Sequence, residues 1–178
     1  DGRRENVYEL PRCQFIFLGQ NNYIELHMPL NIWNMNFMLG HNSTVKIMPH
    51  TSDWVLDLSV KKEPDNNQHT KLLIGQNCTS NGTINIEFTT GGGGDIIIGD
   101  DCMFAYAINI MNGDYHTIFD PKTKEILNPN ADVVIGDHVW VAPGTMIAKG
   151  AKIPNNCVVG AKSFLNHKFT TKNSLIAG

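Results

Sequence analysis

The chain has 178 residues, of which 42% are hydrophobic and 17% charged, and its 14 basic and 17 acidic residues give a net charge of −3. This length favours one domain with a buried core. The charge balance argues against nucleic-acid and acidic-membrane partners. No apolar run approaches the roughly 20 residues of a transmembrane segment, and the polar start at Asp1 shows no signal-peptide pattern.

The four cysteines stand far apart, and no two of them form a CxxC pair. This spacing indicates neither a zinc site nor a redox dithiol, and it argues against a disulfide scaffold. We therefore expect reduced thiols and a cytoplasmic protein.

The first 70 residues are less regular than the rest of the chain and richer in aromatic residues. We expect one domain over residues 1–178, with irregular coils over about 1–70 and regular coils over about 71–178. Within the irregular part, the segment from Met48 to Leu72 breaks any repeat. Its polar run from Lys61 to Gln68 predicts an exposed loop.

Further along the chain, an aliphatic residue recurs every six positions, at Ile135, Val141, Ile147, Ile153, Val159 and Leu165. Five of the residues four positions after these are small or β-branched, in the set Val139, Thr145, Ala151, Cys157, Ser163 and Phe169. Neither a helix nor a lone strand has a period of six. The pattern predicts an all-β fold, a left-handed parallel β-helix that forms a triangular solenoid of hexapeptide repeats.

The same frame reappears upstream as aliphatic-glycine pairs that start each coil, at Ile74-Gly75, Ile98-Gly99, Ile135-Gly136 and Val159-Gly160. Cys78, Cys102 and Cys157 occupy the small inward position, where a thiol fills the core. The tract Gly91–Gly94 lacks the following Lys-Ser or Lys-Thr and the helix of a phosphate-binding loop. We therefore expect it to form a tight corner between coils.

The period fails between Ile110 and Ile135, where a polar insert over about residues 112–132 predicts a projecting loop. Insertions in solenoids often carry function. This one holds His116, flanked by Asp114 and Asp120. An imidazole is the usual general base near neutral pH, and a neighbouring carboxylate could orient it. The alternative interpretation is a solvated loop histidine.

The other residue types exclude several chemistries. No pair of histidines has HExxH spacing and no acidic or histidine cluster indicates a metal site. No GxSxG motif indicates a serine hydrolase. His138 lies at an outward position, where we expect a surface residue.

Trp140 is the last residue of its hexad and should point outward. An exposed tryptophan is costly unless it covers a ligand or packs against a neighbouring subunit. Five lysines gather in the last coils and form either a solvated face or a site for an anionic ligand such as coenzyme A. They are Lys149, Lys152, Lys162, Lys168 and Lys172.

Taken together, these residues resemble the hexapeptide-repeat acyltransferases, most closely the O-acetyltransferases of maltose, galactosides and capsular polysaccharides of the polysialic acid type. The resemblance covers about residues 70–178 and includes the motif from Ile135 to Trp140 and the segment from Ser174 to Gly178. The segment from Asp114 to Asp120 is similar to the histidine loop of capsular acetyltransferases. The 24-residue separation of His116 and Trp140 also matches that family.

The resemblance implies a bacterial homotrimer with active sites in the clefts between subunits, where acetyl-CoA is the co-substrate and no metal takes part. It implies that His116 removes a proton from a hydroxyl of the sugar or polysaccharide acceptor, with Trp140 beside the reacting centre. The residues expected along the coenzyme A groove are Ala142, Pro143, Ala161, Lys162 and Lys168. Those expected to contact the acceptor are Asn81 and Tyr115.

Two features depart from the family and two other functions stay open. Pro143 has no N–H to offer a pantetheine carbonyl, and residues 1–70 align with no family version. The same fold supports N-acetyltransferases that act on amino sugars. A non-catalytic structural solenoid is the third reading of the sequence.

Overall fold

The structure is a computed structural model that describes residues 12–50 and 56–178. The polar start at Asp1 and residues 51–55 of the expected break lie outside the described residues. The described residues form strands and turns only, and none of them belongs to a helix that could span a membrane.

The strands make three parallel sheets. The seven-stranded sheet contains β1 (Cys13–Phe17), β3 (Ile32–Leu39), β5 (Leu56–Lys62), β8 (Ile84–Phe88), β11 (Ile108–Met111), β14 (Met146–Ile147) and β17 (Phe164–Leu165). The six-stranded sheet contains β2 (Tyr23–Leu26), β4 (Ser43–Ile47), β6 (Thr70–Ile74), β9 (Ile96–Ile98), β12 (Val133–Ile135) and β15 (Lys152–Ile153). The five-stranded sheet contains β7 (Thr79–Ser80), β10 (Met103–Phe104), β13 (Trp140–Val141), β16 (Val158–Val159) and β18 (Leu175–Ile176).

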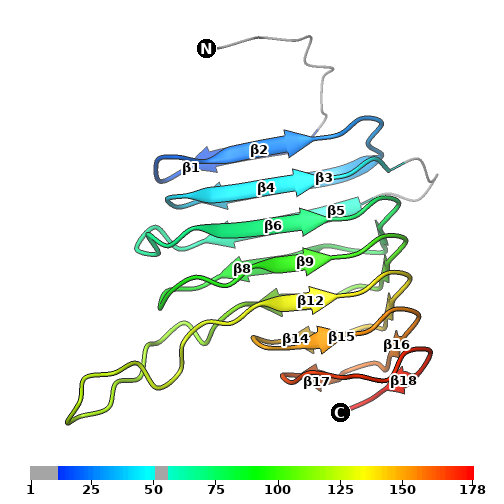
Figure 1. Cartoon of the computed structure of the whole chain (residues 1–178). Helices are drawn as coiled ribbons and strands as arrows, with labels where there is room; N and C mark the ends of the chain where they lie inside the picture. The colour runs from blue at the N-terminus through cyan, green and yellow to red at the C-terminus, as the bar shows by residue number, and fades with distance from the viewer. Residues whose placement is uncertain (1–11, 51–55) are drawn as a thin grey trace.

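From β6 to β17 the chain visits the six-, five- and seven-stranded sheets in turn, one strand at a time. Each strand inside a sheet pairs in parallel with the strand one coil earlier and the strand one coil later. Figure 1 shows the resulting stack of coils, with the first strands at one end and β17 and β18 at the other. The predicted parallel β-helix is confirmed.

The six-residue period places aliphatic side chains in register inside the prism. Ile74, Ile98, Ile135 and Ile153 pair in succession across the six-stranded sheet, and each is buried. Burial of one such side chain contributes roughly 1.5–3 kcal/mol relative to an exposed one. Cys78, Cys102 and Cys157 are also buried inside the coils, as the sequence predicts. The stack of inward aliphatic residues is therefore the core.

The expectation of an exposed loop from Lys61 to Gln68 is wrong at two positions. Lys62 ends β5, is fully buried, and donates hydrogen bonds from Nζ to the carbonyl oxygens of His41 and Gln68. Asn66 is also buried and donates from Nδ2 to the carbonyl oxygens of Thr89 and Gly92. The solenoid corner turns the backbone carbonyls inward, and these polar side chains satisfy them.

The insert between β11 and β12 leaves the solenoid as a long loop, as predicted. Its two arms pair through an antiparallel bridge between Phe119 and Ile126. In Figure 1 the loop extends well beyond the stack of coils. The stacked coils form the body of the molecule, and the insert projects from them.

Candidate functional site

The insert leaves the solenoid at the corner between the seven- and six-stranded sheets. Asn112, buried at its start, accepts a hydrogen bond from the Thr89 amide (2.9 Å) and donates to the carbonyl oxygen of Gly94 (3.0 Å). Asn130, near its end, donates to the carbonyl oxygens of Thr89 and Gly92 (both 3.1 Å). Both ends of the insert are thus bound to the glycine tract, which forms the predicted tight corner between coils.

The close fit at this corner requires glycine at position 113. A Cβ atom added there would lie 2.0 Å from Oδ1 of Asn130 and 2.2 Å from Oγ1 of Thr89. The backbone therefore passes directly over the two polar side chains that close the base of the insert. This packing fixes the point from which His116 projects.

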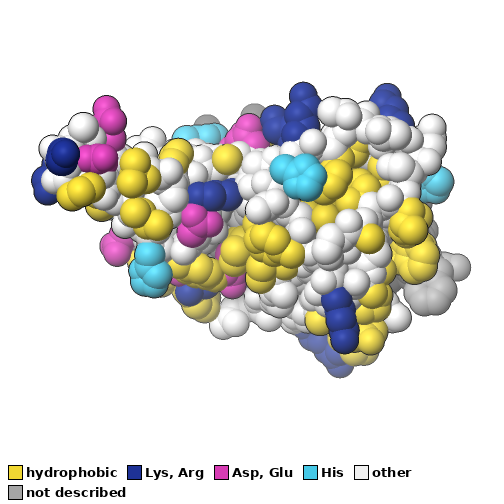
Figure 2. All heavy atoms as spheres, turned by 90° about the horizontal axis from the view of Figure 1, so that it is seen from below, with side chains coloured by type: hydrophobic (Ala, Val, Ile, Leu, Met, Phe, Trp, Pro, Cys, Tyr) yellow, Lys and Arg dark blue, Asp and Glu magenta, His cyan; other side chains and the backbone are white. Residues whose placement is uncertain are grey.

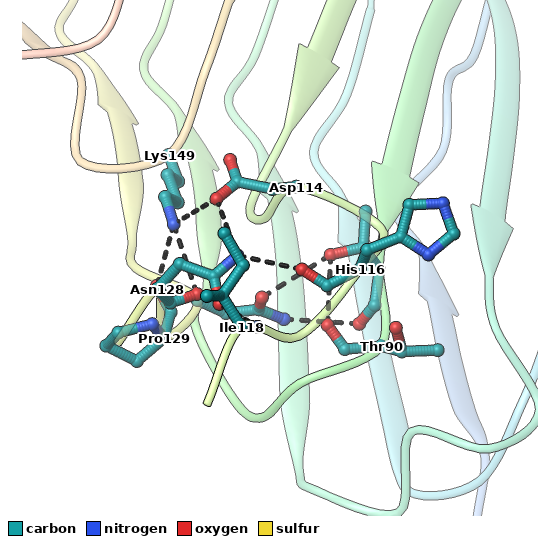
Figure 3. A network of polar contacts seen from close by, with 9 residues as sticks. Thr90, Asp114, His116, Ile118, Asn128, Pro129 and Lys149 are labelled. Atoms are coloured by element: carbon teal, nitrogen blue, oxygen red, sulfur yellow. Dashed lines mark hydrogen bonds and ion pairs between the residues drawn. The ribbon is translucent and has the colours of Figure 1, made fainter. Parts of the chain in front are cut away.

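His116 lies three residues further along and is exposed. Its amide donates to the carbonyl oxygen of Asp114 (2.8 Å), and its imidazole ring forms no hydrogen bond with any described residue. Figure 3 shows the ring pointing away from the polar network that holds its backbone. An exposed ring with two unengaged nitrogen atoms is accessible to a substrate proton.

The expected orientation of the ring by a neighbouring carboxylate is not found. Asp114 pairs with Lys149 (2.5 Å) and accepts from Asn128 (3.0 Å), and these contacts lower the pKa of its carboxyl group. Asp120 accepts from the amides of Lys122 (2.7 Å) and Thr123 (2.8 Å), which lowers its pKa as well. Asp114 is engaged by Lys149 of the next coil and by Asn128, and Asp120 is engaged by amides of the loop, so neither carboxylate contacts the His116 ring.

Trp140 begins β13 on the outer side of the five-stranded sheet, where 45% of its surface is exposed. The prediction that it points outward is confirmed. It lines a mostly apolar pocket of about 320 Å³ together with Asn81, Tyr106 and Pro143. The structure thus brings together three predicted site residues, Asn81, Trp140 and Pro143.

Tyr106 is a pocket residue that the sequence reasoning missed. Phe104 pairs with Val141 in the sheet, so Tyr106 lies one coil away from Pro143 at the equivalent position of the turn. The residue one coil before Pro143, which the repeat places at the equivalent position, is Tyr106, and this spacing could have identified it.

On the other side of Trp140 lies a smaller pocket of about 160 Å³ that contains Asp101, His138 and Asn156. His138 is exposed, as predicted, and its Nδ1 lies 3.1 Å from Oδ1 of Asn156. Among the described residues, no group of three potential ligands could hold a metal ion.

The residues expected along the coenzyme A groove follow β13 and β16. The amide of Ala142 donates to the carbonyl oxygen of Val159 (3.0 Å), and the amide of Lys162 donates to that of Pro143 (2.9 Å). In the described part of the chain, the Ala161 amide has no such partner. Lys162 and Lys168 are exposed, which leaves their ammonium groups available to an anion.

His116 and Trp140 occupy different parts of one prism. His116 lies at the corner between the seven- and six-stranded sheets, whereas Trp140 lies on the five-stranded sheet, the face opposite that corner. His116 lines neither of the pockets beside Trp140. Tyr115 lies next to His116, away from the pocket that contains Asn81.

The six-residue repeat matches a known family of proteins. Residues 132–167 match the family model "Bacterial transferase hexapeptide (six repeats)". The chain carries the hexapeptide repeat of bacterial transferases. Its sequence is 34% identical over 138 residues, 77% of its length, to a protein from Neisseria meningitidis named polysialic acid O-acetyltransferase. A protein of the same name from Escherichia coli O1:K1 / APEC is 38% identical over 56 residues, 32% of the chain.

Solved structures agree with this similarity. The polysialic acid O-acetyltransferase OatWY superimposes with a TM-score of 0.55 at 26% identity, over 93% of this hexapeptide-repeat chain and 85% of that one. The polySia specific acetyltransferase NeuO gives a TM-score of 0.60 at 20% identity, over 93% and 89% of the two chains, and supports the fold alone. The family resemblance and the left-handed β-helix predicted from the sequence are confirmed.

The matched region spans 60% of the meningococcal relative and 18% of the relative from Escherichia coli. The match of 138 residues is longer than the segment 71–178, so it extends into the first 70 residues, and the expectation that those residues align with no family member is wrong.

Proposed function

We propose that this hexapeptide-repeat protein is an acetyl-CoA-dependent O-acetyltransferase that acts on a sugar hydroxyl of a bacterial surface polysaccharide, with His116 as the general base. One observation carries the proposal: the only long interruption of the regular coils in residues 71–178 presents an exposed, unengaged imidazole on a firmly held loop. The similarity to two proteins named polysialic acid O-acetyltransferase supports an anionic capsular polymer as the acceptor class.

In the proposed reaction, His116 accepts the proton of the sugar hydroxyl while the hydroxyl oxygen attacks the carbonyl carbon of the acetyl thioester. Breakdown of the tetrahedral intermediate breaks the C–S bond and releases the coenzyme A thiolate, which takes the proton from the imidazolium. No covalent acyl-enzyme forms. A backbone amide near the thioester stabilises the oxyanion. The Ala161 amide is the candidate, because it donates no backbone hydrogen bond between coils in the described part of the chain.

The residues of the predicted groove fit the chemistry of coenzyme A. The pocket beside Trp140 is mostly apolar and suits a pantetheine chain, while exposed Lys162 and Lys168 offer positive charge to the phosphates. Pro143 contributes shape and no hydrogen bond. The fit rests on these side chains and on the pocket volume of about 320 Å³.

We also propose that the active site forms between adjacent copies of a homotrimer. Within one chain, the base lies at one corner and the Trp140 pocket on the opposite face, so a single copy does not bring them together. The insert exposes five large hydrophobic side chains, Tyr115, Ile118, Phe119, Ile126 and Leu127. Figure 2 shows such side chains along the projecting insert, where a second copy would cover them.

The first test is the release of coenzyme A thiol from acetyl-CoA in the presence of polysialic acid. The His116→Ala variant should lower turnover by at least about a hundredfold, since a positioned base contributes roughly a factor of 10² to 10⁴. The His138→Ala variant, which changes another exposed histidine, serves as the control and should retain more activity than His116→Ala. Near-normal turnover of His116→Ala would contradict the mechanism.

Two alternatives stay open, and the same assay separates them. An N-acetyltransferase would prefer an amino sugar to an acceptor that offers hydroxyl groups alone. A structural solenoid would neither bind coenzyme A in calorimetry nor release its thiol.

A further inference from the structure

The insert is bound by side chains of the coils on both sides of it. Thr90, in the corner that follows β8, donates from Oγ1 to the carbonyl oxygen of Tyr115 (2.6 Å). Lys149, in the corner that follows β14, pairs with Asp114 (2.5 Å) and donates to the carbonyl oxygens of Asn128 (3.1 Å) and Pro129 (3.3 Å). The loop is therefore tied to the coil before it and to the coil after it.

Within the insert, Asn128 joins the two arms around the histidine. Its Nδ2 donates to the carbonyl oxygen of His116 (2.8 Å) and to Oδ2 of Asp114 (3.0 Å). Its Oδ1 accepts from the amide of Ile118 (2.6 Å). One side chain thus holds the backbone at His116 and Ile118 and the carboxylate of Asp114, and Figure 3 shows this amide at the centre of the network.

The imidazole ring itself takes no part in these contacts. Its direction is therefore set by the backbone at residue 116 and by no side-chain partner among the described residues. A displacement of about 1 Å in a reacting group can cost roughly a hundredfold in rate. Contacts that fix this backbone therefore bear directly on catalysis.

We propose that Asn128, held in place by Lys149 and Asp114, is a positioning residue that sets the orientation of His116. The catalytic half of this inference rests on the proposed function, because it takes His116 as the general base. Lys149 also joins the loop to the coil that follows it. The network then fixes the base relative to the coils of its own chain.

The test compares Asn128→Ala and Lys149→Met with Lys122→Met, which removes an exposed lysine that makes no ion pair in the described part of the chain. Asn128→Ala should lower kcat by at least about tenfold while KM for acetyl-CoA stays within about twofold, because the base is misplaced and the donor groove is intact. Lys149→Met should show a smaller loss of the same kind. Lys149→Arg should recover most of it, since arginine keeps the charge and several donors.

Peptide-level hydrogen exchange gives a readout that does not depend on activity. Amides of residues 113–118 should exchange faster in Asn128→Ala and Lys149→Met than in the wild type and in Lys122→Met. Unchanged exchange in both variants would overturn the inference. The inference would also be overturned if His116→Ala is inactive but Asn128→Ala combines faster exchange with a wild-type kcat. Faster exchange together with an active His116→Ala variant would overturn the proposed function and leave the loop-fixing role of Asn128 standing.

Discussion

At the scale of single residues, the fold places ionisable groups in two contrasting settings. Lys149 of the next coil lowers the pKa of the Asp114 carboxyl group, and the amides of Thr123 and Lys122 in the loop lower that of Asp120. Lys62 is buried inside a corner, where it donates hydrogen bonds to carbonyl oxygens, and burial lowers its pKa to about 8. The contacts of the two aspartates stabilise the charged carboxylates, whereas burial destabilises the charged ammonium group of Lys62.

The buried lysine makes a testable prediction about pH. The folded-state pKa of Lys62, about 8, lies below the ordinary value of 10.5, so between these values the unfolded chain binds more protons. The contribution of Lys62 to the free energy of unfolding should therefore rise with pH over this window, by roughly 1–3 kcal/mol. Denaturant titrations of the wild type and Lys62→Met at pH 7.5 and 10 measure the difference. A difference between the two proteins that does not change with pH would contradict the assignment.

At the scale of elements, the features that depend on local periodicity could be predicted from the sequence. The inward aliphatic residues, the core cysteines, the glycine corner and the insert at residues 112–132 all follow from spacing alone. The buried state of Lys62 and Asn66 did not, because their partners come from other coils, as Thr89 does for Asn66. The same holds for the pairing of Lys149 with Asp114, which joins residues 35 positions apart.

The base of the insert offers a second prediction at this scale. Gly113→Ala forces a Cβ atom against Asn130 and Thr89, and overpacking of this kind costs about 1–3 kcal/mol. Gly93→Ala is the matched control, because its new Cβ meets its nearest neighbour, the carbonyl oxygen of His69, at an ordinary 3.6 Å. Thermal unfolding should therefore show a lower Tm for Gly113→Ala than for Gly93→Ala. Equal melting temperatures would show that the corner tolerates the added methyl group.

At the scale of the whole molecule, the arrangement of the candidate site is the main result. The resemblance implied active sites in the clefts between subunits, with Trp140 beside the reacting centre, and the folded chain places His116 at a corner and Trp140 on the face opposite it. The 24-residue separation matches the family, but it does not reveal that the chain crosses the six-stranded sheet between the two residues. The winding of the chain shows that one copy does not bring the two residues together, and the proposed shared site assigns them to neighbouring copies.

The measurement that tests this account most directly is complementation between two inactive variants, His116→Ala and Trp140→Ala. Each variant alone should be nearly inactive as a homotrimer. When the two are unfolded, mixed in equal amounts and refolded, about a quarter of the subunit interfaces should pair an intact His116 with an intact Trp140, if assembly is random. Coenzyme A release should then recover to roughly a quarter of the wild-type rate. No recovery in mixtures shown to contain mixed trimers would contradict a site shared between subunits.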